Sequence, residues 1–138
     1  MPERALVIID IQNDYFPGGK MELEGADAAA AKAARAIAKF RDQRLPLIHV
    51  RHLSVRPGST FFILGTAGAE IHEQVRPRQG EKEIEKNFPN SFRGTDLDQA
   101  LKESGTKELV SVPARQVHAA FLAALNGFYA KVITTDEL

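Results

Sequence analysis

The sequence of 138 residues contains no cysteine and no tryptophan. The absence of cysteine excludes disulfide bonds and thiolate metal sites within this chain. An excess of charge is also missing, since 18 basic residues balance 18 acidic residues, and no basic or acidic run indicates a nucleic-acid partner or a charged tail. No apolar stretch approaches the roughly 20 residues of a membrane-spanning helix, and the N-terminus lacks a signal-peptide pattern. We expect one cytoplasmic domain over residues 1–138, without nucleic-acid or membrane partners.

Common ligand-binding loops are lacking as well. Gly18-Gly19 is not part of a Gly-x-Gly-x-x-Gly or Walker sequence, so a phosphate-binding loop is not indicated. Asp10-x-Gln12-x-Asp14 lacks the glycine and the distal glutamate of a calcium loop. The histidines show no metal-ligand spacing; they are His49, His52, His72 and His118. We therefore expect no metal site.

The stretch from Arg4 to Gly19 contains the strongest positive signal. Ala5 to Ile9 are consecutive apolar residues, which is typical of a strand buried on both faces in a parallel sheet. Asp10 follows directly, at the carboxyl end of the predicted strand, where open α/β sheets bind their ligands. A turn or cap residue is the alternative role for this aspartate.

The rest of the chain alternates between strand and helix patterns. Strands are predicted at 5–9, 45–51, 83–88, 107–112 and 128–134, and helices at 26–44, at 96–103 and from Pro113 to about residue 125. This order predicts an α/β fold, a three-layer α/β/α sandwich with a mostly parallel sheet. The long segment 52–80 is predicted to be a functional loop. Its Phe61 and Phe62 line a substrate pocket, or else they pack on the core or on a partner subunit.

Two oppositely charged residues end predicted strands. Lys86 closes the third strand as Asp10 closes the first, so both side chains are expected in one crevice of the sheet. Such a pair could act in catalysis, with the carboxylate accepting a proton and the ammonium holding negative charge. A purely structural ion pair fits the same spacing.

Two stretches resemble a known family. The isochorismatase-like cysteine hydrolases have a first motif similar to Leu6-Val-Ile-Ile-Asp10-Ile-Gln12-Asn-Asp14-Tyr-Phe16-Pro-Gly-Gly. Their second motif is similar to Glu85-Lys86-Asn-Phe-Pro-Asn-Ser91-Phe92-Arg-Gly-Thr95-Asp-Leu97. The resemblance covers residues 1 to about 110. It implies the isochorismatase-like (Rossmann-like) sheet with strand order 3-2-1-4-5-6.

The resemblance also implies a chemistry. The family uses an Asp–Lys–Cys triad without a cofactor, so Asp10 would take the thiol proton and Lys86 would lower the cysteine pKa and bind developing charge. The cysteine would attack a small amide- or ester-like substrate, or an isochorismate-like enol ether, and form a thioester-type intermediate. Gln12 and Phe16 would be pocket residues. The metal ligands of the nicotinamidase branch have no match after the second strand, and a homo-oligomer is expected.

The triad's cysteine has no counterpart in this chain. The fourth strand runs directly into what resembles the family's last helix, so on the order of 40 residues, a helix and a strand with their loops, are missing near 110–112. Ser111 is no substitute, because it lies within a strand and has no histidine beside it. Three explanations stay open: a segment absent from this sequence, an internal deletion in the protein, or a non-catalytic relative that acts as a binding or assembly module.

Overall fold

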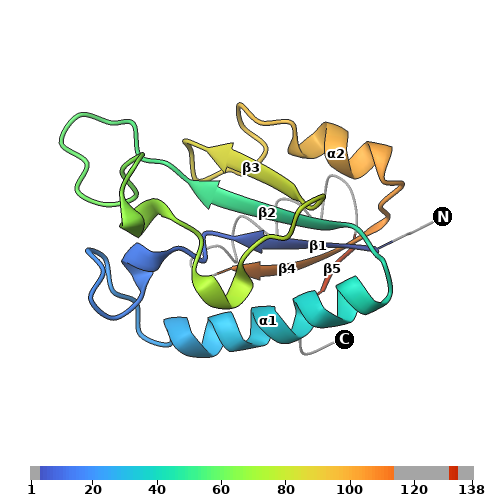
Figure 1. Ribbon diagram of the computed structural model, residues 1–138. Helices are drawn as coiled ribbons and strands as arrows, with labels where there is room; N and C mark the ends of the chain where they lie inside the picture. The colour runs from blue at the N-terminus through green and yellow to red at the C-terminus, as the bar shows by residue number, and fades with distance from the viewer. Residues whose placement is uncertain (1–3, 114–130, 134–138) are drawn as a thin grey trace.

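A five-stranded parallel sheet forms the centre of the molecule (Figure 1). The computed structural model describes residues 4–113 and 131–133. The strand order is β3-β2-β1-β4-β5, and every neighbouring pair is parallel. The strands are β1 (Arg4–Ile9), β2 (Leu47–His52), β3 (Lys82–Lys86), β4 (Glu108–Pro113) and β5 (Lys131–Ile133). The predicted order 3-2-1-4 of the first four strands is therefore confirmed.

Helices cover both faces of this sheet. The helix α1 (Ala26–Asp42) packs on the face that presents Leu6 and Ile8, and α2 (Leu97–Glu103) packs on the face that presents Val7 and Ile9. Figure 1 shows the two helices on opposite sides of the strands. The predicted α/β/α sandwich is confirmed for the part of the chain that the structure describes.

The strand β1 is buried on both faces, as its uninterrupted apolar sequence predicts. Residues Ala5 to Ile9 are each at most 2 % exposed, and they contribute alternately to the two hydrophobic clusters. Because successive side chains of a strand point to opposite faces, both faces of a central strand must be apolar. Because β1 is held in the core on both faces, the position of Asp10, the residue that follows it, is fixed at the end of the strand.

The segment between β2 and β3 contains short 3-10 turns rather than one open loop. These are η2 (Ala67–Ala69) and η3 (Glu73–Val75), and a further turn, η1 (Asn13–Tyr15), follows β1. An antiparallel bridge between Gln12 and Ile71 joins the two regions. The long segment therefore lies against the residues that follow β1.

Element ends differ slightly from the prediction. The helix α1 stops at Asp42, two residues early, and Arg44 adopts a left-handed conformation with φ 56°, which cannot continue a helix. The helix predicted from Pro113 onward falls on 114–130, outside the described residues, and only the Lys131–Ile133 part of the last strand is described. Within the described ranges, no helix is long and apolar enough to cross a membrane.

Candidate active site

Asp10 directly follows β1 and sits in an unusual backbone conformation. Its φ is 59°, in the left-handed region, and the residue is only 2 % exposed. Its N–H donates to the carbonyl of Val50 on β2 at 2.9 Å, which holds the turn against the sheet. Aspartate is one of the few residues with a side chain that visits this region readily. The chain thus bends where the strand ends and places a carboxylate at the carboxyl edge of the sheet.

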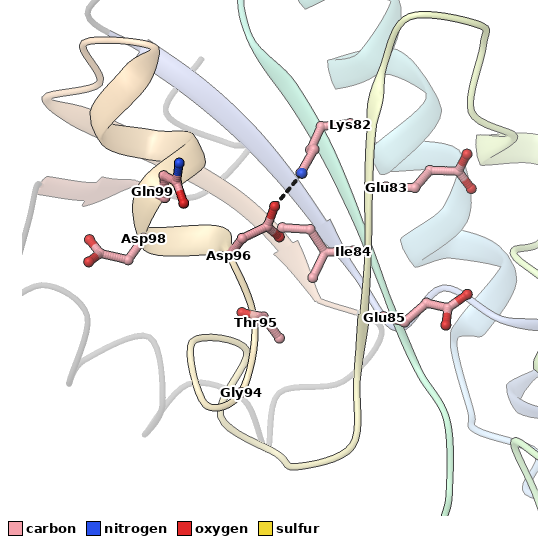
Figure 2. A pocket seen from close by; sticks show the side chains of 9 residues that line it. All are labelled: Lys82, Glu83, Ile84, Glu85, Gly94, Thr95, Asp96, Asp98 and Gln99. Atoms are coloured by element: carbon pink, nitrogen blue, oxygen red, sulfur yellow. Dashed lines mark hydrogen bonds and ion pairs between the residues drawn. The ribbon is translucent and has the colours of Figure 1, made fainter.

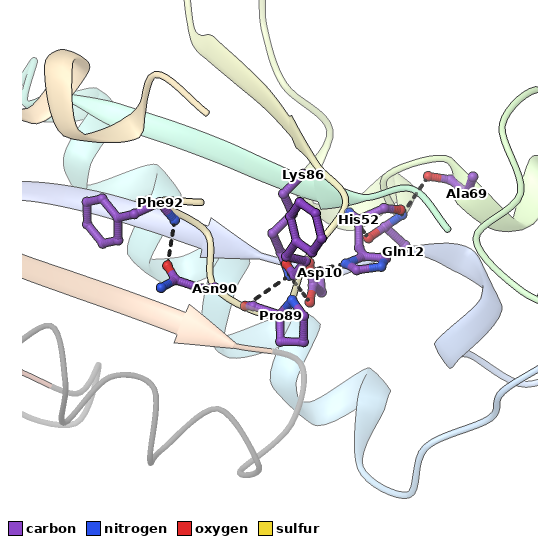
Figure 3. A network of polar contacts seen from close by, with 9 residues as sticks. Asp10, Gln12, His52, Ala69, Lys86, Pro89, Asn90 and Phe92 are labelled. Carbon is purple, nitrogen blue, oxygen red and sulfur yellow. Dashed lines mark hydrogen bonds and ion pairs between the residues drawn. The ribbon is translucent and has the colours of Figure 1, made fainter. Parts of the chain in front are cut away.

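Lys86 is the last residue of β3, and its ammonium meets this carboxylate. The Nζ atom lies 3.1 Å from Oδ2 of Asp10, and the two side chains are 0 % and 3 % exposed. Nζ also lies 3.3 Å from the carbonyl of Phe88 and 3.4 Å from that of Pro89, in the turn after β3 (Figure 3). The expected meeting of the two charges in one place is present. Its catalytic role stays a prediction.

Burial makes each charge of this pair depend on the other. Removing one member of a buried pair typically costs about 3–5 kcal/mol, because the other is left uncompensated. The ammonium of Lys86 is held by oxygen atoms from three other residues, which fixes its position. An oriented, water-shielded ion pair of this kind can take up or hold charge during a reaction.

Gln12 is completely buried and holds the backbone of His52. Its Nε2 donates to the carbonyls of His52 and Ala69 at 2.8 and 2.9 Å, and its Oε1 accepts from the His52 N–H at 2.8 Å. Figure 3 shows this amide between the end of β2 and Ala69. The side chain therefore joins the end of β2 to the segment after it. Its role in substrate binding stays a prediction.

The three phenylalanines proposed for the pocket all take part in ring packing. Phe16 is 5 % exposed and stacks on His72 with ring centroids 3.7 Å apart. Phe62 is 1 % exposed and meets Tyr15 edge-to-face at 4.7 Å, while the partly buried Phe61 contacts Phe62 at 4.9 Å. For Phe62, this geometry corresponds to packing on the core. The substrate contacts of these rings stay predictions.

Two polar residues were missed in the sequence, His52 beside the pair and Asp14 in η1. His52 is in register with Lys86 on the neighbouring strand, and Nδ1 of its ring lies 3.4 Å from the lysine Nζ. Asp14 is 4 % exposed, and its carboxylate accepts from the N–H groups of Lys20 and Phe62. The signal for His52 was its place at the end of β2, which matches the places of Asp10 and Lys86. The sequence alone gave no partner for Asp14.

A hollow beside the edge strand β3 is lined by residues other than Asp10 and Lys86. Its volume is about 640 Å³, and Lys82 in its wall is paired with Asp96 (Figure 2). The other residues in its wall are mostly acidic or small, among them Glu83, Glu85 and Asp98. Charged side chains on an edge strand discourage pairing with another strand, which explains this composition without a ligand. Within residues 4–113 and 131–133, no group of three or more potential ligands is placed to hold a metal ion.

A doubly covered parallel sheet with a polar site at its carboxyl edge defines a Rossmann-like α/β protein. The comparison with protein families narrows this class. The isochorismatase domain model matches residues 4–112. The chain belongs to the isochorismatase family.

Curated relatives agree with this assignment. An uncharacterized isochorismatase family protein of Bacillus subtilis, YddQ, is 40 % identical over 173 residues, covering 96 % of this chain and 96 % of the relative. A secreted isochorismatase effector of Verticillium dahliae, Isc1, is 34 % identical over 110 residues, covering 80 % of this chain and 57 % of the relative.

Solved structures share the fold. A candidate isochorismatase hydrolase from Oleispira antarctica superposes with a TM-score of 0.79 at 37 % identity, over 98 % of this chain and 95 % of that one. An N-carbamoylsarcosine amidase from Thermoplasma acidophilum gives a TM-score of 0.81 at 24 % identity, over 96 % and 80 % of the two chains. The second similarity concerns the fold alone.

Proposed function

We propose that this domain is the major part of a cofactor-independent cysteine hydrolase that cleaves a small amide- or ester-like substrate, or an isochorismate-like enol ether. The observation that carries the proposal is the buried contact of 3.1 Å between Asp10 and Lys86 at the carboxyl edge of the sheet. Membership of the isochorismatase family supports it, since this contact joins the family's two motifs.

With an amide- or ester-like substrate, Asp10 takes the proton of a cysteine thiol, and the resulting thiolate attacks the substrate carbonyl. Lys86 holds the negative charge that develops, and the proton on Asp10 passes to the departing amine or alcohol. Water, deprotonated by the same carboxylate, then hydrolyses the thioester and returns the thiol.

The nucleophile requires a segment that this chain does not contain. The alignment with YddQ runs over 173 residues, 35 more than the whole chain has, so that relative carries residues without a counterpart here. The family match also ends at residue 112, beside the predicted position of the missing segment. Both findings support a longer form of the protein, and the cysteine in it is part of the proposal. The position and content of the segment stay predictions.

Mass spectrometry of the protein from its natural source separates this proposal from its rival. We expect a mass about a quarter above that of the 138-residue chain, and one thiol that reacts with an alkylating reagent. A mass equal to that of the chain favours the alternative, a non-catalytic binding or assembly module. Light scattering on protein eluting from a size-exclusion column tests the homo-oligomer that the proposal includes. Fractionation of cells tests the proposed cytoplasmic location.

The catalytic role of Asp10 is tested by exchange for asparagine in the cysteine-containing form. Asparagine tolerates the left-handed backbone at this position but cannot take a proton. We expect Asp10→Asn to lower hydrolysis of a panel of small amides and esters by about 10²-fold or more, the usual contribution of a general base. Glu85→Gln is the control, because Glu85 is exposed on β3 and contacts Arg51. Turnover at the normal rate in Asp10→Asn contradicts the base role.

A further inference from the structure

The imidazole of His52 stands beside the ammonium of Lys86, and the family's triad as implied by the sequence has no place for it. The two residues are register partners on the parallel strands β2 and β3, so their side chains leave the sheet on the same face. The distance from Nδ1 to Nζ is 3.4 Å (Figure 3). This contact therefore follows from the pairing of two strands rather than from a mobile side chain.

The chemistry of an ammonium decides what the histidine does there. A lysine ammonium has three N–H donors and no acceptor, so each polar neighbour must accept. Besides His52, these neighbours are the carboxylate of Asp10 and the carbonyls of Phe88 and Pro89. These four groups share three N–H donors. A hydrogen bond across the contact with His52 requires a lone pair on Nδ1, which corresponds to a neutral imidazole with its ring proton on Nε2.

The surroundings hold the ring in this place. The buried amide of Gln12 binds both the N–H and the carbonyl of His52. On the other side, the ring of Phe62 lies 6.0 Å from the imidazole, centroid to centroid. The backbone of His52 is thus fixed by hydrogen bonds, and Phe62 limits the space into which its ring can turn.

A neutral acceptor differs from a second carboxylate in its effect on Lys86. A carboxylate at this position would cancel the positive charge that Lys86 needs to hold a developing anion. An imidazole lone pair satisfies an N–H of the ammonium and leaves the net charge of the Asp10–Lys86 pair unchanged. The same is true of the two backbone carbonyls.

We propose that His52 is a positioning residue of this site: Gln12 fixes its backbone, and its Nδ1 accepts from Lys86 and aims the ammonium at Asp10. The inference rests on the proposed function in that Lys86 is the group that binds developing charge. The tautomer of His52 and its hydrogen bond with Lys86 can nevertheless be measured without any enzymatic turnover. A failure of the hydrolase proposal is therefore distinguishable from a failure of this one.

Nuclear magnetic resonance of the ¹⁵N-labelled chain tests the tautomer directly. Long-range proton–nitrogen correlations identify which ring nitrogen carries the proton, and the signals of His52 are assigned by their loss in His52→Asn. We expect a proton on Nε2 and an Nδ1 resonance that shifts in Lys86→Met, while the resonances of His72 stay in place. A proton on Nδ1, or an Nδ1 signal that ignores Lys86→Met, overturns the proposal. The tautomer is measured in the unmodified protein, so this part of the test remains decisive even if Lys86→Met fails to fold.

A matched pair of substitutions separates the acceptor from the volume of the ring. His52→Asn keeps a side-chain oxygen on Cγ, close to the place of Nδ1, and His52→Leu has the same branching without an acceptor. The readout is the rate at which the amine of Lys86 is acetylated, followed by peptide mass spectrometry. We expect the rate to rise on the order of tenfold in His52→Leu, the size of one lost hydrogen bond from a charged donor, and to stay near the original in His52→Asn. Equal rates in the two variants contradict a role for the acceptor.

Discussion

At the scale of single residues, Asp10 combines a strained backbone with a buried charge. A left-handed φ of 59° costs most residues with a side chain roughly 1–3 kcal/mol and costs aspartate less, so it persists where the surroundings offset it. Here the hydrogen bond to Val50 and the contact with Lys86 do so. A structural cap would not need its charge partner 76 positions further along the chain. The combination favours a functional over a purely local role.

The pair's contribution to stability is measurable with a double-mutant cycle. We expect Asp10→Asn and Lys86→Met each to lower the free energy of unfolding by about 3–5 kcal/mol, because each leaves a buried charge without its partner. The double variant should lose much less than the sum of the two, since no unpaired charge remains. Urea unfolding followed by circular dichroism gives the three differences.

The control for this cycle is a pair of exposed charges. Lys102 and Asp98 form a contact of 2.9 Å on α2, with side chains 65 % and 40 % exposed. Neutralising either one is expected to change stability by less than about 1 kcal/mol. Strictly additive losses at Asp10 and Lys86 would show that the two charges do not depend on each other.

At the scale of elements, a buried carboxylate is one of the groups that hold the segment after β2 to the turn after β1, beside the bridge between Gln12 and Ile71. Asp14 in η1 accepts from the N–H of Phe62 at 2.7 Å, and Phe62 is itself in a left-handed conformation with φ 55°. The carboxylate stabilises this unfavourable backbone and keeps the ring of Phe62 in the core. The carboxylate also fills the space beside Gly68, where a Cβ atom would collide with it.

Gly68→Ala is therefore predicted to destabilise the protein by about 1–3 kcal/mol, the usual cost of overpacking. The cause is the displacement of the Asp14 side chain, which cannot move without losing its bond to Phe62. Thermal and urea unfolding of the single variant measure the loss. In an Asp14→Ala background the same glycine substitution should cost much less, because its obstacle is gone. If Gly68→Ala destabilises the Asp14→Ala variant as much as the original protein, the collision is not with the Asp14 side chain.

The apolar patterns of the sequence predicted most helices and strands. The differences lie where tertiary contacts determine which residues are buried and where a strand ends. On α1, Ala36 is buried beside Ala33 and Ile37, whereas Ala38 is exposed. Both are alanines, so the pattern alone could not choose between them. The carboxyl end of β3 fell on Lys86 rather than Phe88, because the chain turns there and its carbonyls face the ammonium. The position of this turn depends on the contact between the Lys86 ammonium and these carbonyls, which the spacing of residues in the sequence does not predict.

At the scale of the whole molecule, the sheet order and the meeting of Asp10 with Lys86 were predictable from the sequence. The order is what the resemblance to the isochorismatase-like hydrolases implies, and the meeting of the two charges follows from the rule that parallel strands present their carboxyl ends on one edge. The pairing of β2 with β3 in a register that sets His52 beside Lys86 was not predictable, because period and composition leave the register of two short strands open. The fine structure of the site depends on that register.

A buried cluster between α1, β2 and the strand β3 makes the stability of the whole molecule depend on pH. His49 is 1 % exposed, with Nε2 3.4 Å from Glu81, and Glu81 is bound by Arg41 of α1. Burial is the main reason that the pKa of His49 is lowered from 6.5, and the nearby Glu81 opposes this only in part. Burial alone would raise the pKa of Glu81, but hydrogen bonds from Arg41 and from the N–H of Arg78 hold it below 4.5.

The sign of the effect follows from where protons bind. Between pH 6.5 and the lower pKa of folded His49, the unfolded chain binds a proton that the folded chain does not, so unfolding becomes easier as the pH falls. The stabilisation by neutral His49 is complete above pH 6.5. Glu81 adds a further loss only below pH 4.5. Acidification from above 6.5 to just above 4.5 therefore separates the contribution of His49 from that of Glu81.

We predict that His49→Gln flattens the pH dependence of unfolding in this window, because glutamine binds no proton in either state. The measurement is the free energy of unfolding in urea at a series of pH values for both proteins, each referred to its own value above pH 6.5. This reference removes any constant difference in stability that the substitution causes. The original protein should lose stability more steeply than the variant as the pH falls. Parallel curves would mean that the cluster of His49, Glu81 and Arg41 does not take up its proton on unfolding, and that the acid sensitivity of the molecule arises from other groups.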